Sequence, residues 1–162
     1  MDLTVRAATR DDVPAIVRLL ADDVLGAQRE LVQDPVAPDY LRAFDEMAAQ
    51  PGNELLVAVK DEEVIGCLQL TIITGLSRRG MRRAQLESVR VSAAHRGAKV
   101  GELLVLDAIG RARAAGCGLV QLTTDVSRTD ARRFYERLRF KATHIGMKLM
   151  LSVGEERGRH RG

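Results

Sequence analysis

One segment near the middle of the chain constrains the fold more than any other. Residues 85–92 alternate between polar and apolar side chains, which predicts a β-strand, and apolar residues then recur at helical spacing from Val100 to Ala112. A short loop that contains Arg96 and Gly97 joins the two. The first backbone N–H groups of such a helix have no intrahelical acceptor and favour an anion, phosphate above all. The segment therefore predicts a phosphate site at a strand–helix junction.

The residues of this junction suit an anion in kind as well as in position. Gly97 and Gly101 would let a phosphate approach the backbone closely, while Arg96 and Lys99 add positive charge. The glycine spacing fits neither a Walker loop nor a dinucleotide-binding fingerprint. Helix starts with a glycine and an arginine are common, so an ordinary helix N-terminus is the alternative.

The remaining periodicity predicts one α/β (α+β) domain over residues 1–153, because 162 residues suit a single domain. We expect a mixed central sheet of about seven strands flanked by about four helices. The expected strands are 3–8, 55–60, 64–74, 85–92, 119–124, 140–145 and 147–153, and the expected helices are 13–24, 40–49, 100–115 and 129–138. Residues 154–162 lack an apolar anchor and are expected to form a mobile basic tail.

Composition excludes several classes of protein. No apolar run approaches the ~18 residues that a membrane span needs, and the charged N-terminus lacks the apolar core of a secretory signal. Aromatic residues make up 3% of the chain, too few for a nucleic-acid surface built on base stacking. Two cysteines, Cys67 and Cys117, are too few for a disulfide framework or a zinc site. We expect a cytoplasmic protein with no metal, no membrane and no nucleic acid as partner.

Charge is divided unequally along the chain. Residues 1–76 hold six Lys or Arg and fourteen Asp or Glu, whereas residues 77–162 hold nineteen and eight. This difference in charge between the halves predicts that the second half binds an anion and the first half a cation. Solvated surface charge on both halves is the alternative.

Two motifs resemble those of the GCN5-related N-acetyltransferase superfamily. The family's acyl-CoA loop, Arg/Gln-x-x-Gly-x-Gly/Ala after a Val-x-Val strand, is similar to Arg96-Gly-Ala-Lys-Val-Gly101 after Val89-Arg-Val91. A second signature, Asn-x-x-Ala-x-x-Phe-Tyr-Glu-x-x-Gly-Phe, resembles residues 128–140. The resemblance covers residues 3–153. It implies a GNAT-like fold, acetyl-CoA as acyl donor, a small-molecule amine as acceptor, and a homodimer as a family-level expectation.

The resemblance also implies where the cofactor binds. In the family its pantetheine arm fills a gap between the strand before the loop and the next parallel strand, here expected at 119–124. The cofactor-binding residues implied in this chain are Val89, Arg90, Val91, Arg96, Gly97, Ala98, Lys99, Val100, Gly101, Arg128 and Tyr135. The sequence departs from the family pattern at Lys99 and Arg139, where the family has Gly, and at Arg128, where it has Asn.

Roles in catalysis follow from the same resemblance. Tyr135 matches the family's proton donor to the departing thiolate, and an N–H near Val89 would stabilise the oxyanion of the tetrahedral intermediate. Under strict alternation Glu87 shares a face with Val89 and Val91, so it is a candidate base for the amine proton, and His144 competes for that role. Tyr135 as a core residue and Glu87 as a solvated strand residue are the alternatives.

Three functions remain open on the sequence. The leading one is transfer of an acetyl group from acetyl-CoA to a primary amine by direct attack, with a small cationic acceptor because the acidic half holds the helices that wall the acceptor site in this family. The second is a non-catalytic acyl-CoA-binding sensor or regulatory module. The third is a nucleic-acid-binding protein, for which the arginine-rich loop 77–83 would serve; a solvated hairpin tip is the simpler interpretation of that loop.

Overall fold

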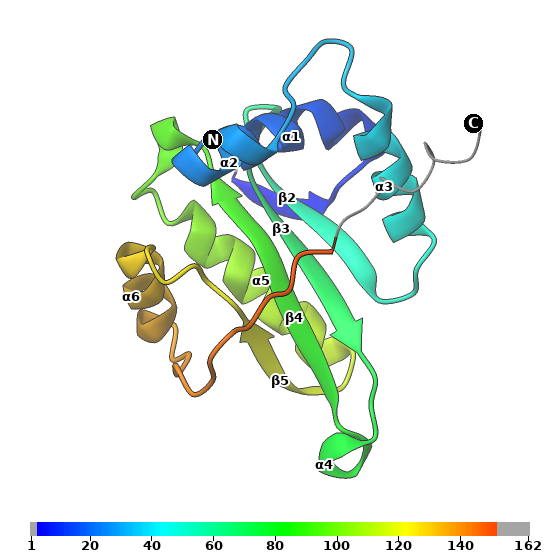
Figure 1. The fold of residues 1–162 in the computed structure, drawn as a ribbon, viewed down its shortest axis with the longest axis vertical. Helices are drawn as coiled ribbons and strands as arrows, with labels where there is room; N and C mark the ends of the chain where they lie inside the picture. The colour runs from blue at the N-terminus through cyan, green and yellow to red at the C-terminus, as the bar shows by residue number, and fades with distance from the viewer. Residues whose placement is uncertain (1–2, 152–162) are drawn as a thin grey trace, which may run out of the picture. The chain divides into compact units, whose positions relative to one another are not determined.

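The computed structural model describes residues 3–151 and confirms a mixed α/β fold. The chain divides after Val126 into two compact units. The first unit holds a sheet of five strands in the order β1-β2-β3-β4-β5 (Figure 1). Their bounds are β1 Thr4–Ala7, β2 Asn53–Lys60, β3 Glu63–Ile73, β4 Arg82–Val91 and β5 Cys117–Leu122. Neighbours are antiparallel except β4 and β5, which are parallel.

Helices join and cover these strands. In the first unit they are α1 Val13–Ala21, α2 Val24–Arg29, α3 Pro38–Ala48, α4 Ser77–Gly80 and α5 Val100–Ala114, with 3-10 turns η1 Arg10–Asp12 and η2 Ala93–His95. The second unit contains α6 Thr129–Arg137. Helix α5 is the crossover that parallel strands β4 and β5 require. None of the helices in the described part of the chain is both long and apolar enough to cross a bilayer.

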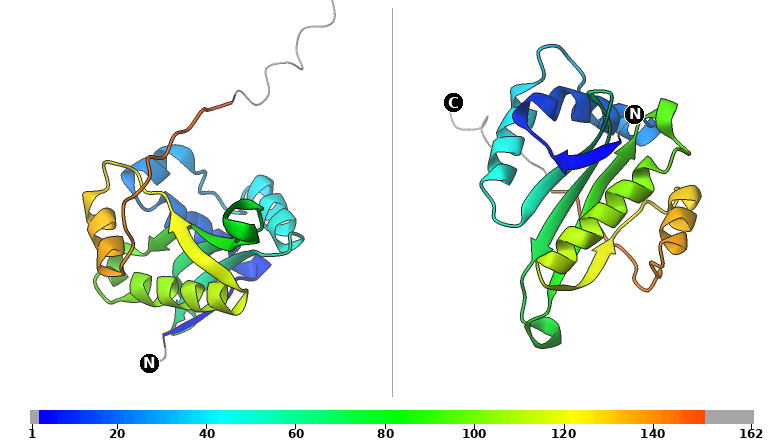
Figure 2. Two further views of the ribbon diagram at one scale, coloured as in Figure 1. Left: turned by 90° about the horizontal axis from the view of Figure 1, so that it is seen from below. Right: turned by 180° about the vertical axis from the view of Figure 1, so that it is seen from behind.

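Helix α5 packs on one face of the sheet, and α1 packs on the other (Figure 2). The α5 face buries apolar side chains of the strands and the helix, among them Leu56, Leu68, Leu70, Ala84, Leu86, Val100, Leu104 and Ala108. Arg111 of α5 also binds Glu54 of β2 at 2.8 Å. Opposite, Ile16 and Leu19 of α1 pack against Val57 and Cys67. Packing on both faces therefore holds β3 and its two neighbouring strands, β2 and β4, in place.

The start of α1 is held by a carboxylate that is nearly buried. Asp12 accepts hydrogen bonds from the Thr9 backbone N–H at 2.7 Å and from the Thr9 hydroxyl at 3.1 Å, and it binds Arg6 of β1 at 2.7 Å. The Arg6 guanidinium lowers the pKa of Asp12 below its ordinary value, more than burial raises it. The acid three residues after a threonine thus caps the helix start, as its spacing predicts.

Strand β4 contains one residue more than strict alternation allows. Cys67 pairs with Arg90 and Gln69 pairs with Glu87, so two residues of β4 face one residue of β3. Ser88 in this β-bulge has φ 53°, in the left-handed region. The bulge places Glu87 and Arg90 on the α1 face, whereas Val91 pairs with Gly66 on the α5 face. The prediction that Glu87 and Val91 share a face is therefore wrong.

The expected number of strands was also wrong. The sheet has five strands rather than about seven, and the described part of the chain has six α-helices rather than about four. Residues 140–151 form no strand, because an alternating pattern makes a strand only where its backbone finds a neighbour to pair with. Residues 152–153 and the tail 154–162 lie outside the described residues.

The helix division differs for a local reason. The predicted helix 13–24 ends early, at Ala21, because Asp22 leaves helical geometry. A second helix, α2, then begins at Val24, with Asp23 as its N-cap accepting from the Gly26 N–H at 2.5 Å. Residues 77–80 are the exposed tip of the β3–β4 hairpin, as the simpler interpretation has it, whereas Arg82 and Arg83 already belong to β4. The single turn α4 contains Arg78 and Arg79 in left-handed conformation.

Gly66 sets how closely α5 approaches the sheet. A Cβ atom there would lie 3.0 Å from the Arg90 carbonyl oxygen, 3.0 Å from Leu104 and 3.2 Å from Val100. We expect Gly66→Ala to lower the free energy of unfolding by roughly 1–3 kcal/mol, measured by urea denaturation, because these neighbours must shift. Gly110→Ala in α5 is the control: nothing lies within 4 Å of its Cβ position, so it should raise stability by about 0.5–1 kcal/mol. Equal effects of the two changes would contradict the close approach.

Candidate functional site

Strands β4 and β5 separate halfway along β4. Their parallel pairing runs from Arg82 and Cys117 to Leu86 and Leu122, where β5 ends. Strand β4 continues to Val91, paired with β3 alone. The second half of β4, Glu87 to Val91, therefore has one edge that β5 does not occupy. Strand β5 covers 117–122 rather than 119–124 and does not pair with β4 beside Val89, and a cofactor-holding gap there stays a prediction.

The loop after β4 presents unpaired N–H groups at the start of α5. In the described part of the chain, the backbone N–H groups of residues 97, 99, 100, 101 and 102 have no hydrogen-bond acceptor. The first bond of the helix runs from the Leu103 N–H to the Lys99 carbonyl at 3.0 Å. The Ala98 N–H is already donated to the His95 carbonyl at 3.3 Å, so it does not join the group as expected. The junction can accept an anion at the positive end of the helix dipole.

The backbone of this loop adopts left-handed geometry at two positions. Gly97 has φ 83° and Lys99, the N-cap of α5, has φ 61°. Glycine occupies such a conformation freely, whereas lysine is disfavoured there by on the order of 1 kcal/mol. The family pattern has glycine where Lys99 stands, and this φ gives the physical reason. In exchange Lys99 brings an exposed ammonium group to the mouth of the loop.

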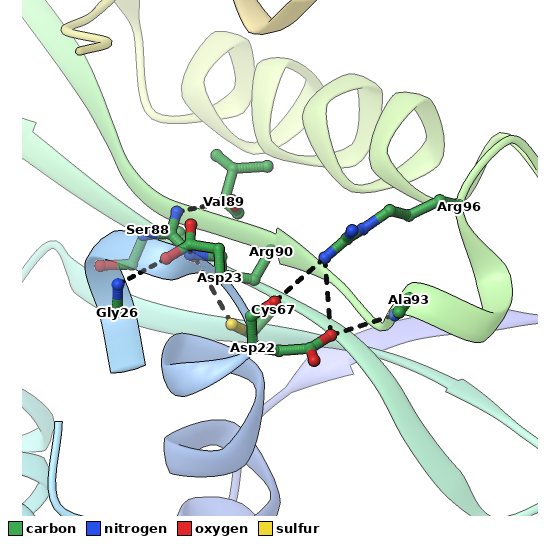
Figure 3. A network of polar contacts seen from close by, with 9 residues as sticks. All are labelled: Asp22, Asp23, Gly26, Cys67, Ser88, Val89, Arg90, Ala93 and Arg96. Carbon is green, nitrogen blue, oxygen red and sulfur yellow. Dashed lines mark hydrogen bonds and ion pairs between the residues drawn. The ribbon is translucent and has the colours of Figure 1, made fainter. Parts of the chain in front are cut away.

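Two adjacent carboxylates between α1 and α2 connect to the end of β4 and to this loop (Figure 3). Asp22 accepts from the Ala93 N–H at 3.1 Å, and its carboxylate lies 3.5 Å from Arg96 Nη2. The same guanidinium donates to the Asp22 backbone carbonyl at 3.2 Å. Arg96, expected to face a phosphate, is thus tethered to α1, and two of its three nitrogens make no bond within the described chain.

Asp23 connects to β4 beside the bulge. Its carboxylate lies 3.8 Å from Arg90 Nε, a buried atom with no hydrogen-bond acceptor in the described residues, and Arg90 Nη1 donates to the Val89 carbonyl at 3.0 Å. Below them the Cys67 thiol donates to the Ser88 carbonyl at 3.5 Å. Burial raises the pKa of Cys67 to about 12, so this thiol is not a nucleophile. Arg90 therefore supports the strand from its α1 face.

Sequence reasoning missed the roles of Asp22 and Asp23. Two acidic residues at the end of a helical pattern look like ordinary surface residues, and nothing in the sequence pairs them with arginines about seventy positions away. The unequal charge of the two halves was the one signal that bore on them, since each pair joins an acidic residue of the first half to a basic residue of the second.

Comparison with known proteins identifies the family. A model described as the acetyltransferase (GNAT) family matches residues 19–140. This chain belongs to that family. It is 29% identical over 143 residues to an aminoalkylphosphonate N-acetyltransferase of Salmonella typhimurium, covering 86% of each chain. A crystal structure of a transcriptional regulator from Bacillus halodurans superposes with a TM-score of 0.90 at 47% identity, covering 93% of this chain and 100% of that one. A Trypanosoma brucei acetyltransferase gives 0.76 at 26% identity, covering 93% and 100%.

GNAT family members are acyltransferases that use acetyl-CoA as co-substrate. The features described above fit such a ligand: free N–H groups suit its diphosphate, and an unpaired strand edge suits its amide-containing arm. An open hollow of about 570 Å³ beside Ser92 and Ala93 fits it less well, because most of the charged side chains that line it are acidic: Asp11, Asp12, Arg18, Asp22, Glu62 and Glu63.

The remaining predicted site residues divide between the two units. Glu87 is exposed, and its carboxylate makes no ion pair or hydrogen bond with any other residue that the structure describes. In the second unit, Tyr135 of α6 packs edge-on against Phe134 and Phe140, with ring centroids 5.0 and 5.7 Å away. Arg128 is the N-cap of α6. His144 is exposed and bonds the Thr143 hydroxyl at 2.7 Å.

Arg139 ends α6 in the conformation that the family's glycine would adopt. Its φ is 69°, its N–H donates to the Glu136 carbonyl at 2.9 Å, and the Phe140 N–H donates to the Tyr135 carbonyl at 3.0 Å. These two bonds satisfy carbonyls of the last turn, as a glycine cap does. The departure at this position therefore keeps the geometry of the helix end.

Asp22 should hold the segment after β4 in place. In Asp22→Ala the Ala93 N–H loses its acceptor and Arg96 loses its carboxylate, so we expect hydrogen exchange of the Ala93 amide to become about fivefold faster, measured by NMR. Asp11→Ala, an exposed carboxylate of η1 without a bonding partner among the described residues, is the control and should leave that rate unchanged. An unchanged rate in Asp22→Ala would show that the segment is held by other contacts.

Proposed function

We propose that this chain is an acetyl-CoA-dependent N-acetyltransferase that acts on a small primary amine by direct attack in a ternary complex. The observation that carries the proposal is the separation of β4 from β5 at Leu86 and Leu122, next to a helix start with unpaired N–H groups. A thioester on a long polar arm with a diphosphate at its far end needs both features at once. Family membership supports the same ligand.

Each part of the cofactor has residues that suit it. Backbone N–H groups of residues 97 and 99–101, with the Arg96 and Lys99 charges, would hold the diphosphate. Backbone groups of Val89 to Val91 would pair with the pantetheine arm along the edge that β5 leaves. Arg128 is proposed to add a further positive charge from the start of α6.

The chemistry requires a neutral amine, a stabilised oxyanion and a proton for the leaving thiolate. The amine nitrogen attacks the thioester carbonyl carbon, and the carbonyl oxygen becomes an oxyanion that the N–H near Val89 stabilises. The C–S bond then breaks, and Tyr135 donates its proton to the departing thiolate. Glu87 accepts the proton that the amine loses; its freedom from any described ion pair supports this role. His144 is the competing base.

The pH dependence of kcat/KM tests these assignments. Activity should rise through the pKa of the base and fall through the pKa of the acid, so Glu87→Gln should flatten the acid limb and Tyr135→Phe the alkaline limb, each with a loss of about 100-fold or more. His144→Asn should leave both limbs in place. If His144→Asn removes the acid limb and Glu87→Gln does not, the base is His144.

The acceptor is proposed to be cationic, such as a polyamine, an aminoglycoside-like compound or an amino-acid derivative. An acidic first half and an uncommitted Glu87 carboxylate on β4 support this class. The Salmonella relative is named for aminoalkylphosphonates, amines with an anionic group, so these compounds are the competing class.

Release of free thiol from acetyl-CoA in the presence of different amines tests the function and the acceptor class together. We expect turnover that depends on the amine, with the highest kcat/KM for diamines and aminoglycoside-like compounds and lower values for neutral amines and aminoalkylphosphonates. Mass spectrometry of the acetylated amine checks that the acetyl group is transferred rather than hydrolysed. Preference for anionic or neutral amines would remove the cationic class.

A non-catalytic acyl-CoA sensor is the second candidate, favoured by the similarity to a structure named as a transcriptional regulator. A sensor would give heat with acetyl-CoA in calorimetry but no amine-dependent thiol release, whereas the enzyme gives both. Retention of Glu87 and Tyr135 supports the enzyme, since a sensor needs neither. Absence of both heat and turnover would overturn the two candidates together.

A cytoplasmic location and a homodimer stay predictions, as does independence of nucleic acid, membranes and metals. Among the described residues no group of three or more His, Cys, Asp or Glu side chains is arranged to hold a metal ion. Light scattering on the purified full chain gives its oligomeric state directly.

A further inference from the structure

The α1 face of the sheet changes from apolar to polar toward the start of β4. Near α1, Val57 and Cys67 on this face are buried. Farther along, strand register brings six polar side chains to the same face, and we call them the polar strip. They are Asn53, Gln69, Thr71, Gln85, Glu87 and Gln121.

The strip runs across four neighbouring strands. Asn53 of β2 pairs with Thr71 of β3, Thr71 pairs with Gln85 of β4, and Gln85 pairs with Gln121 of β5. In antiparallel and parallel pairs alike, directly paired residues point to the same face. In the adjacent row Gln69 lies opposite Glu87. Amide and carboxylate groups therefore form one continuous surface.

Amide groups of the strip are already oriented. Gln69 Nε2 donates to Asn53 Oδ1 at 3.0 Å, and Gln121 Nε2 donates to Gln85 Oε1 at 2.9 Å. The side chains of Asn53, Gln69 and Gln85 are half-buried rather than fully exposed. These cross-strand bonds fix their rotamers while the remaining amide hydrogens and oxygens stay available. Binding of a polar molecule would then cost little side-chain entropy.

The strip lies where the acyl group would arrive. Gln85 and Gln121 form the last pair but one before β4 and β5 separate, and Glu87 is the first residue of β4 beyond the final pair. The carboxylate of Glu87 has no partner among the described residues, so its charge is open to a cation. A molecule seated on the strip would face the end of the gap between the strands.

We infer that the polar strip binds the acceptor, and that the acceptor is a hydrophilic amine with hydroxyl or further amino groups within reach of Gln69 and Gln85. Glu87 attracts the ammonium group, and the two amides bind the other polar groups. An amine with only an alkyl or aryl body leaves these amides desolvated without partners, so the strip discriminates against it. The inference rests on the proposed acetyltransferase activity and specifies its substrate class.

Steady-state kinetics of the full chain test the strip with Gln69→Leu and Gln85→Leu. The probes are spermidine, an aminoglycoside-like amine and 2-phenylethylamine, with acetyl-CoA as donor. Each variant should raise KM for the hydrophilic amines by about fivefold or more, because one bound polar group loses its partner. KM for acetyl-CoA and its binding heat should not change. Thr74→Val, an exposed polar-to-apolar change just beyond the end of β3, is the control and should alter none of these values.

The outcomes distinguish failure of the polar strip as acceptor site from failure of the proposed acetyltransferase activity. If both variants are active and their KM for the acceptor is unchanged, the polar strip does not bind the acceptor. A wild type that prefers 2-phenylethylamine contradicts the inference in the same way. Gln69→Asn and Gln85→Asn, which shorten the side chain and keep its amide, serve if a leucine variant does not fold, and they should raise acceptor KM in the same direction. A wild type that acetylates no amine but folds normally overturns the proposed function instead.

Discussion

The pairing of β4 organises the rest of this structure. Along its first half the strand is bonded on both edges, to β3 and to β5; along its second half it is bonded to β3 alone. A backbone edge left without a partner attracts another polar chain. Here that edge leads directly to the start of α5, and Gly66 lets α5 pack close against β3 behind it. A rigid sheet thus carries one open segment in a fixed place.

Two ion pairs connect the α1–α2 junction to the open half of β4 and to the loop after it. Asp22 and Asp23 lie together between α1 and α2, and their partners Arg96 and Arg90 lie six residues apart on the loop and the strand. Neither pair is deeply buried, so each contributes little stability by itself. Their effect is geometric: they connect the helices on the α1 face to the second half of β4 and to the loop after it.

Local pattern predicted the elements of the first unit well and failed where pairing decides the outcome. The strand, loop and helix around Arg96 were found because alternation and helical spacing are local properties, and Lys99 stands out because one position of a known motif requires a left-handed backbone. Two further strands after residue 139 were expected from alternation alone, which does not say whether a neighbour exists to bond with. The roles of Asp22 and Asp23 depend on residues far along the chain, and no local signal encodes them.

The bulge at Ser88 has a consequence for how this sequence can change. Because one additional residue turns the strand over, the side chains before it and after it follow opposite parities. Loss of that single position would rotate Val89, Arg90 and Val91 by half a turn, bringing Arg90 to the α5 face and Val91 to the α1 face. The strand therefore cannot be shortened by one residue here without exchanging the two helix-covered faces for every side chain that follows.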